Sequence, residues 1–296
     1  MNWKANMRNK LFQEALAQIP EATNKKVAKM TDELDVEWLQ STEKVIEDII
    51  ENAYKLYMPQ IKSEITELTN FIFENTSLKF GLPIKVLEIG TKFGGTFYIW
   101  NKLNELLTRD REHWSHWDVS DLCISIDMSD GGIHGGIGDE EMDKRDLWFC
   151  ERFPNCHFIR GNSHSKETFA ELANGLMSSN DYKKEIDPYK HGYFDFLFID
   201  GDHTYEGVKQ DWEDYSPFLK KGGIAVFHDT VISDRHHERN VYVGEFWRDL
   251  TSLRLFDGQE IDKDICSIDG NWWEIVEFVE PGNDWAGISC LKKIVI

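Results

Sequence analysis

The sequence predicts an α/β fold built on a mostly parallel sheet, and two observations carry this prediction. Short apolar runs alternate with helical patterns five times between residues 85 and 227, which is typical of repeated strand–helix units. Two later apolar runs, Trp272–Val279 and Gly287–Ile294, are joined through Pro281-Gly282-Asn283. Because that connection is too short for a helical crossover, the last two strands are expected to pair antiparallel.

Two of these strands end in side chains suited to chemistry. The apolar run Phe194–Ile199 reads as a buried strand and ends at Asp200-Gly201-Asp202-His203. A helical pattern follows up to Leu219 and is ended by two glycines. The next strand, Ile224–Phe227, ends in His228-Asp229. Acids and imidazoles therefore follow neighbouring strands, at the edge where open α/β sheets bind ligands.

The first strand, Lys85–Gly90, leads into a glycine-rich turn at Thr91–Thr96. Such a turn lets the backbone approach a ligand closely and points free N–H groups at it. Its glycine spacing is not the dinucleotide fingerprint, which argues against a nicotinamide dehydrogenase. The second strand, Cys123–Ile126, ends in Asp127, where an acid can accept both hydroxyls of a ribose. A helix cap or a solvated strand end is the alternative for this acid.

Residues 1–82 are predicted to form a helical extension, and residues 83–296 the main domain. Apolar stripes at 45–56 and 61–72 fit two amphipathic helices. The extension either packs on the main domain or acts as a lid or oligomerisation arm, so a homo-oligomer stays open. A glycine-dense loop at 131–138 and a polar loop at 233–240 are further candidates for contacts with a substrate.

Composition limits the partners and the compartment. Lysine and arginine number 33 and aspartate and glutamate 53, giving a net charge of −20. So acidic a surface repels phosphate backbones, which makes nucleic acid a poor partner. Five scattered cysteines without a CxxC pair favour a reducing compartment. With no apolar signal core and no run able to span a bilayer, a soluble cytoplasmic protein without a membrane partner is expected.

Three segments of the chain resemble a known family: LEIGTKFGGT at 87–96, FIDGDHTYEGVKQDW at 198–212 and GGIAVFHDT at 222–230. They resemble class I (Rossmann-like) S-adenosylmethionine-dependent methyltransferases, in the branch with macrocin-type and rhamnosyl O-methyltransferases and cephalosporin hydroxylase-like proteins. The resemblance covers roughly residues 84 to 296. It implies a seven-stranded sheet with the last strand inserted antiparallel.

The resemblance also implies roles for individual residues. Asp200 and the pair His228-Asp229 would hold Mg²⁺, and His203, with Asp200 beside it, would be the catalytic base. Two departures stand out, because the best-described members carry two acids after the fifth strand and often an acid in the place of Asn162. The implied cofactor contacts are Glu88, Gly90, Thr91, Lys92, Gly94, Gly95, Thr96, Asp127, Asn162, Ser163 and Asp200.

The expected function is Mg²⁺-assisted methylation of a hydroxyl on a small molecule, with a sugar or glycosylated metabolite as the first guess. A hydroxyl is a weak acid, so a positioned base such as His203 would remove its proton during attack on the sulfonium. Helix capping is the alternative for His203, and a buried, backbone-bonded histidine is the alternative for His228. Asp202 is expected to cap the helix rather than to bind the metal. Two other functions stay open: binding of S-adenosylmethionine without catalysis, and an activity like that of the cephalosporin hydroxylase-like proteins.

Overall fold

A computed structural model of the chain describes residues 36–80, 82–108, 123–129, 136–153, 155–178, 192–252 and 265–294. The chain divides into two units, Met1–Val45 and Ile46–Ile296. The sheet belongs to the unit Ile46–Ile296. Most of the predicted glycine-dense loop and all of the first 35 residues lie outside the described ranges. No helix in these ranges is long and apolar enough to cross a membrane.

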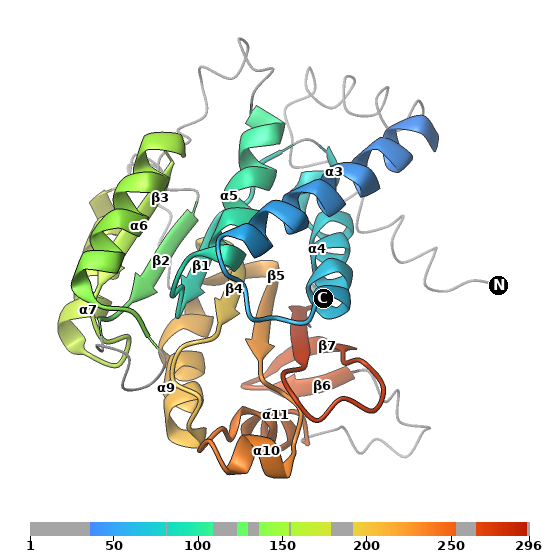
Figure 1. Cartoon of the computed structure of the whole chain (residues 1–296). Coiled ribbons are helices and arrows are strands. Elements are labelled where there is room, and N and C mark those ends of the chain that lie inside the picture. Colours follow the sequence, from blue (N-terminus) through green and yellow to red (C-terminus); the bar gives the residue numbers. More distant parts are fainter. Residues whose placement is uncertain are drawn as a thin grey trace. The chain divides into compact units, whose positions relative to one another are not determined.

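The sheet has eight strands in the order β3-β2-β1-β4-β5-β8-β7-β6 (Figure 1). Strands β1 to β5 run parallel, β8 pairs antiparallel with β5, and β7 and β6 continue the antiparallel edge. The predicted parallel sheet with an antiparallel strand inserted late in the chain is confirmed. The strands are β1 (Val86–Ile89), β2 (Cys123–Asp127), β3 (Cys156–Arg160), β4 (Phe194–Ile199), β5 (Leu219–His228), β6 (Ile265–Ile268), β7 (Asn271–Phe278) and β8 (Ile288–Lys293).

The expected number of seven strands is one too few, because β6 was not recognised in the sequence. Strand β6 forms a hairpin with β7 through a two-residue turn, Asp269-Gly270. Both turn residues have positive φ, 49° and 74°, which is the backbone that an Asp-Gly hairpin turn adopts. The Asp-Gly pair between two apolar stretches was the sequence feature from which this hairpin could have been predicted.

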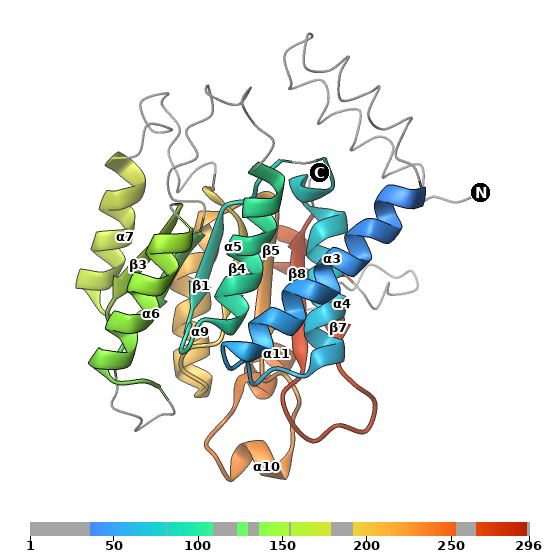
Figure 2. The same ribbon diagram turned by 45° about the horizontal axis from the view of Figure 1, so that its top comes forward.

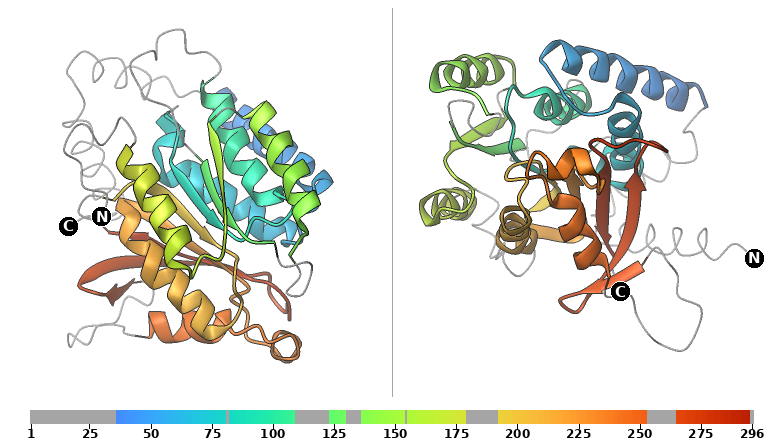
Figure 3. Two further views of the ribbon diagram at one scale, coloured as in Figure 1. Left: turned by 90° about the vertical axis from the view of Figure 1, so that its left-hand side faces the viewer. Right: turned by 60° about the horizontal axis from the view of Figure 1, so that its bottom comes forward.

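Helices cover both faces of the sheet and enclose two separate cores (Figures 2 and 3). Helices α4, α5 and α6 bury side chains such as Ile65, Phe97 and Phe149 on one face. Helices α7, α9 and α11 bury others, such as Leu172 and Trp212, on the opposite face. The helices are α3 (Val36–Lys55), α4 (Lys62–Asn75), α5 (Gly95–Thr108), α6 (Asp139–Arg152), α7 (Lys166–Ser178), α9 (Tyr205–Tyr215), α10 (Asp234–His237) and α11 (Val243–Thr251), with short 3₁₀ turns η1 (Ser77–Phe80) and η3 (Ser216–Phe218).

The helix after β4 is shorter than predicted. It ends at Tyr215, and Pro217 lies in the 3₁₀ turn that follows, since proline cannot continue the α-helical hydrogen bonds. Leu219 therefore begins β5 and is not the last turn of the helix. The two glycines lie inside the strand, where Gly222 has a φ of 78°, so they do not end the helix as expected.

Glu88 lies within β1 and is completely buried. Its two carboxyl oxygens accept hydrogen bonds from the Thr96 hydroxyl and the Trp100 indole N–H, both at 2.8 Å. Burial raises the pKa of Glu88 to about 8, against an ordinary value of 4.5. The carboxyl is therefore mostly protonated in the folded protein at pH 7 and ionised in the unfolded chain.

Glu88→Gln is expected to flatten the dependence of stability on pH. An acid whose pKa is higher in the folded state costs progressively more stability as the pH rises from its unfolded to its folded pKa. Between pH 5 and pH 8 this cost is on the order of 3 kcal/mol for a shift of this size. The glutamine amide can bond to the same two partners without titrating. Urea unfolding of both proteins at pH 5 and pH 8 measures the difference, and equal pH slopes would contradict the burial argument.

Candidate active site

The turn after β4 brings an imidazole to the carboxyl edge of the sheet. Thr204 caps the next helix, because its hydroxyl accepts a hydrogen bond from the Gly207 N–H at 3.1 Å. Asp202 accepts from the Thr204 N–H at 2.9 Å and so supports the turn rather than capping the helix. The carbonyl of His203 accepts from the Tyr242 N–H at 2.8 Å. The structure thus excludes helix capping for His203 and leaves its ring at the edge of the sheet.

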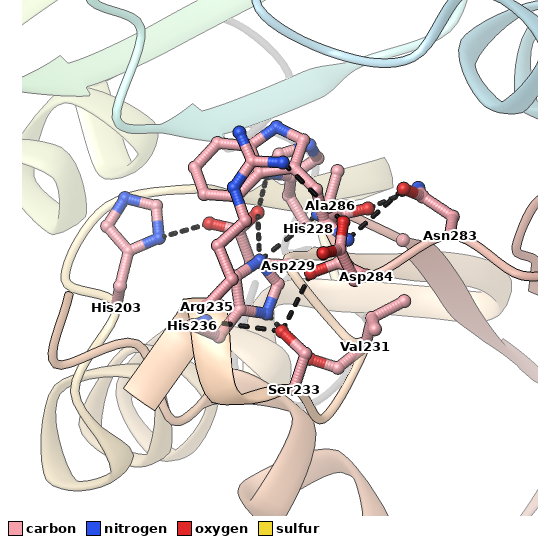
Figure 4. A network of polar contacts seen from close by, with 12 residues as sticks. His203, His228, Asp229, Val231, Ser233, Arg235, His236, Asn283, Asp284 and Ala286 are labelled. Atoms are coloured by element: carbon pink, nitrogen blue, oxygen red, sulfur yellow. Dashed lines mark hydrogen bonds and ion pairs between the residues drawn. The ribbon is translucent and has the colours of Figure 1, made fainter. Parts of the chain in front are cut away.

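The second site acid follows directly after β5. Asp229 has a φ of 61°, a left-handed backbone that Asp tolerates better than most residues. The next residue anchors the turn: the Thr230 N–H donates to the Gly287 carbonyl at 3.1 Å, and the Thr230 and Ser289 hydroxyls lie 2.7 Å apart. This unusual backbone directs the Asp229 carboxylate toward His203 (Figure 4).

The structure brings the four predicted acids and imidazoles together, and Figure 4 shows three of them, His203, His228 and Asp229. Nδ1 of His228 lies 3.1 Å from Oδ1 of Asp200 and 3.2 Å from Oδ1 of Asp229. Nδ1 of His203 lies 2.8 Å from Oδ2 of Asp229. One ligand atom each from Asp200, His203 and Asp229 lies within 4.8 Å of the others. His203, predicted as a base, is therefore also placed where a metal ligand could lie.

The charges at this site are strongly coupled. Burial opposes the charged form of His228, but the Asp200 and Asp229 carboxylates outweigh it and raise the His228 pKa well above its usual range. Burial likewise opposes ionised Asp229, but the imidazoles of His228 and His203 hold the Asp229 pKa well below its usual range. The pKa of His203 is raised too, by Asp229 against the effect of burial. Without a bound cation, an imidazolium thus lies between two carboxylates.

Several polar atoms at the site lack well-directed hydrogen bonds. Within the described part of the chain, both ring nitrogens of His228 and Oδ1 of Asp229 are buried without such a bond, although the ion-pair distances are short. Buried polar atoms are nearly always paired in proteins, by an ion or water if not by protein groups. Two carboxylates with an imidazole are a donor set that divalent cations accept. The residues present therefore fit a bound Mg²⁺ or a similar ion.

His236 supports the site from α10 and was not singled out from the sequence. Its Nδ1 lies 2.6 Å from the Val231 carbonyl, and its Nε2 accepts from the Ala286 N–H at 3.1 Å (Figure 4). The first contact requires a proton on Nδ1 and the second a lone pair on Nε2, so the ring is neutral. Its Nε2 is 3.7 Å from Oδ1 of Asp229, too far for a hydrogen bond. His236 therefore packs the loop behind Asp229 rather than ligating anything.

At three glycines in or next to the glycine-rich turn, other parts of the protein lie where a side chain would be. A Cβ on Gly90 would lie 2.1 Å from the backbone of the turn after β4, so this glycine lets the two strand ends approach. A Cβ on Gly94, whose φ is 91°, would lie 2.6 Å from the Phe149 ring, and one on Gly95 2.6 Å from Cβ of Met58. A valine at Gly94 would therefore disturb the fold whether or not the turn binds a ligand.

Other residues of the turn also bond within the protein. The Thr91 hydroxyl lies 2.5 Å from the Ser125 hydroxyl, and the Thr96 hydroxyl donates to Glu88. Lys92 has a φ of 50°, which turns its N–H toward the end of β2. The side chains of Glu88, Thr91 and Thr96 thus shape the turn, and contact between them and a cofactor remains a prediction.

Asp127 has protein partners on both carboxyl oxygens. Oδ2 accepts from the Lys92 N–H at 2.9 Å and from the Arg145 guanidinium, and Oδ1 accepts from the Met128 N–H at 3.0 Å. Burial raises the Asp127 pKa, and Arg145 only partly offsets this. A ribose would have to share the carboxylate with Arg145. The contact between Arg145 and Asp127 was not predicted. An arginine among the apolar, buried positions of α6 could have indicated that it pairs with an acid inside the protein.

The residues after β3 have partners of their own. Asn162 is exposed and accepts from the His164 N–H at 2.9 Å, and the Ser163 carbonyl accepts from the Tyr215 hydroxyl at 2.7 Å. Behind them, Nε2 of His164 lies 3.1 Å from Oδ1 of the fully buried Asp211. The Asn162 side chain remains accessible to a ligand at the edge of the sheet.

Residues 87–230 match the family model of a methyltransferase domain. The match runs from β1 through the glycine-rich turn to the acids and imidazoles after β4 and β5. These residues, just under half of the chain, therefore resemble a methyltransferase domain in sequence. The resemblance inferred from the three sequence segments is thereby confirmed.

Individual relatives are distant. The chain is 24% identical over 172 residues to the uncharacterized protein y4gI of Sinorhizobium fredii (strain NBRC 101917 / NGR234), covering 58% of this chain and 15% of the relative. It is 27% identical over 163 residues to the uncharacterized protein R132 of Acanthamoeba polyphaga mimivirus, covering 53% and 57%. The chain thus spans less than two thirds of either relative. A solved structure of MycE methyltransferase from the mycinamycin biosynthetic pathway, in complex with Mg, SAH and mycinamycin VI, aligns with a TM-score of 0.45 and 14% identity, covering 84% of this chain and 54% of that one.

Proposed function

We propose that this protein is a methyltransferase that uses S-adenosylmethionine to methylate a hydroxyl of a small molecule, with a sugar or a glycosylated metabolite as the first candidate. The observation that carries the proposal is the 2.8 Å contact between His203 and Asp229 at the carboxyl edge of the sheet. An imidazole held through Nδ1 by a carboxylate presents Nε2 to the substrate as a base. Transfer of a methyl group to a hydroxyl needs such a base, since the proton must leave as the oxygen attacks.

The chemical balance follows from these groups. The acceptor oxygen forms a bond to the methyl carbon as the bond between that carbon and the sulfonium sulfur breaks. The acceptor proton passes to Nε2 of His203, and the Asp229 carboxylate stabilises the imidazolium that results. The products are a methyl ether, S-adenosylhomocysteine and a proton that His203 later releases to water.

Asp200 and Asp229, with His228 or His203, would hold a divalent cation of the Mg²⁺ type. When bound, such an ion lowers the pKa of a hydroxyl near it and orients that hydroxyl. The two carboxylates are suited to Mg²⁺, whereas an imidazole ligand suits a softer ion such as Mn²⁺ better. The pair His228-Asp229 therefore allows Mn²⁺ to bind at least as tightly as Mg²⁺.

A hydroxylase-like activity is the second candidate, and one observation favours it. Nδ1 of His203 and Nδ1 of His228 lie 2.8 and 3.2 Å from the two carboxyl oxygens of Asp229. Two imidazoles and a carboxylate are the ligand set of non-haem Fe(II) oxygenases. Isothermal titration separates the candidates: a methyltransferase binds S-adenosylmethionine and S-adenosylhomocysteine, and a hydroxylase binds Fe(II) with neither of them. Binding of NADH instead would favour a dehydrogenase.

Asp127→Asn is expected to weaken binding of S-adenosylhomocysteine by about 1.5–3 kcal/mol, the usual cost of losing hydrogen bonds to a charged group. Asparagine keeps the size of the side chain and one acceptor oxygen for the Lys92 N–H. Titration calorimetry measures the affinity, and thermal unfolding of the same variant reports the loss of the pair with Arg145. If stability falls while the affinity stays unchanged, Asp127 serves Arg145 alone and is not the ribose ligand.

A further inference from the structure

The connection between α3 and α4 lies directly on the glycine-rich turn. The Tyr57 carbonyl lies 3.0 Å, and Cβ of Met58 2.6 Å, from where a Cβ on Gly95 would be. The connection is fixed from within, because the Tyr54 hydroxyl donates to the Gln60 carbonyl at 2.6 Å. Residues well before the matched methyltransferase domain therefore close one side of the turn.

Gln60 reaches from this connection to the acid after β4. Its Nε2 donates to Oδ2 of Asp200 at 2.8 Å, and this contact fixes which end of the amide faces the carboxylate. The side chain is 5% exposed. Its other end, Oε1, is buried and has no hydrogen-bond partner among the residues that the structure describes. An unpaired buried carbonyl is costly, and in native proteins it usually marks a missing ligand, ion or water.

The surroundings of this oxygen select the partner that it can take. An acceptor needs a donor, and the Asp200 carboxylate beside it makes a cationic donor the most favourable one. Gln60 also lies between Asp200 and the residues that pack on Gly95, where the glycine turn would hold the amino-acid part of the methyl donor. That part carries an ammonium group, which offers N–H donors and a positive charge.

We propose that Gln60 binds the ammonium group of the methyl donor through Oε1, while its Nε2 is held by Asp200. This inference rests on the proposed function, since it presupposes S-adenosylmethionine as the donor. It assigns a ligand contact to a residue outside residues 87–230. The cofactor site would then be incomplete without the connection between α3 and α4.

Two ligands that differ in the amino-acid part test the proposal. S-adenosylhomocysteine carries the ammonium group, and 5′-methylthioadenosine shares the nucleoside and the thioether but lacks it. Gln60→Met keeps the length of the side chain and removes the carbonyl. We expect titration calorimetry to show S-adenosylhomocysteine binding about 10- to 100-fold more weakly to this variant, as for a lost hydrogen bond to a charged group, with 5′-methylthioadenosine binding unchanged.

Two further variants keep the result interpretable. Gln210→Met makes the same change on the exposed side of α9 and should alter neither affinity. Gln60→Glu keeps an acceptor oxygen and should retain the preference for S-adenosylhomocysteine over 5′-methylthioadenosine, even if stability falls beside Asp200. Retention of the preference in Gln60→Glu and its loss in Gln60→Met together support an acceptor at this position.

Each other outcome overturns the proposal. Equal weakening of both ligands in Gln60→Met would mean that Gln60 acts through the fold. Unchanged binding of S-adenosylhomocysteine with loss of Mn²⁺ affinity would make Oε1 a metal ligand instead. If the unaltered protein binds 5′-methylthioadenosine and S-adenosylhomocysteine equally, no group recognises the ammonium. If it binds neither, the proposed function itself fails, which is distinguishable from failure at Gln60 alone.

Discussion

His203→Ala is expected to lower turnover by about 10²–10⁴-fold, the usual contribution of a positioned general base, while cofactor affinity changes little. Asp229 holds the ring through Nδ1 at 2.8 Å, so Nε2 is the nitrogen that can take the acceptor proton. Single-turnover rates with an accepted substrate, together with the affinity for S-adenosylhomocysteine, measure the two quantities. Near-normal turnover in the variant would remove the base from the mechanism.

A matched control lies next to His203 in the chain. Thr204→Ala removes the hydroxyl that caps α9 and should cost about 1 kcal/mol of stability. It leaves the His203 ring in place, so turnover below the melting temperature should stay normal. A loss of turnover in Thr204→Ala as large as in His203→Ala would show that the order of this turn, rather than proton transfer, limits the rate.

The pH dependence of turnover gives a second readout for His203. Asp229 raises the His203 pKa above its ordinary value, so the neutral, basic form becomes available only as the pH rises through this raised value. Activity should therefore climb on the alkaline side of pH 6.5. A bound cation disfavours the imidazolium and would shift this rise in activity to lower pH. In His203→Ala the rise in activity with pH should be absent.

The sheet edge could be predicted because its signals are local. Apolar runs that end in Asp200 and Asp229 identify the strands, and the carboxyl ends of parallel strands meet at one edge. The partners of these acids were not predictable in this way. Gln60 lies 140 positions from Asp200. The partner of a third strand-end acid, Asp127 of β2, is likewise distant, because Arg145 reaches it from α6. Such pairs depend on how the helices pack, which periodicity does not report.

The glycines show a second limit of pattern reasoning. A glycine at position 94 was predicted to make room for a ligand, and the structure shows that it makes room for Phe149. Both needs select the same residue for the same steric reason. Likewise, the pair at 222 and 223 was read as a helix stop but lies inside β5. A glycine marks a backbone constraint, and only the fold tells which neighbour imposes it.

Asp229→Asn is expected to have at least as large an effect on turnover as His203→Ala, because Asp229 contacts both His203 and His228. Asparagine has the same shape and also tolerates the φ of 61° seen here, so backbone strain does not explain a loss. The variant removes the carboxylate that orients the base and one charged ligand of the proposed cation site. Turnover should fall by about 10³-fold or more, since both catalytic contributions are weakened together.

Metal titration of the same variant separates these two contributions. The unaltered protein should bind Mn²⁺ more tightly as the pH rises, because the His228 pKa is raised well above its usual range and the imidazolium between the carboxylates must lose its proton before a cation can replace it. For one proton displaced, the affinity should rise about tenfold per pH unit below that pKa. In Asp229→Asn the His228 pKa should fall, since one of its two carboxylates is gone, so the pH dependence should move to lower pH and the affinity at high pH should drop. Manganese affinity with the same pH profile in both proteins would show that the ion, if it binds, lies elsewhere, and that the loss of turnover comes from His203 alone.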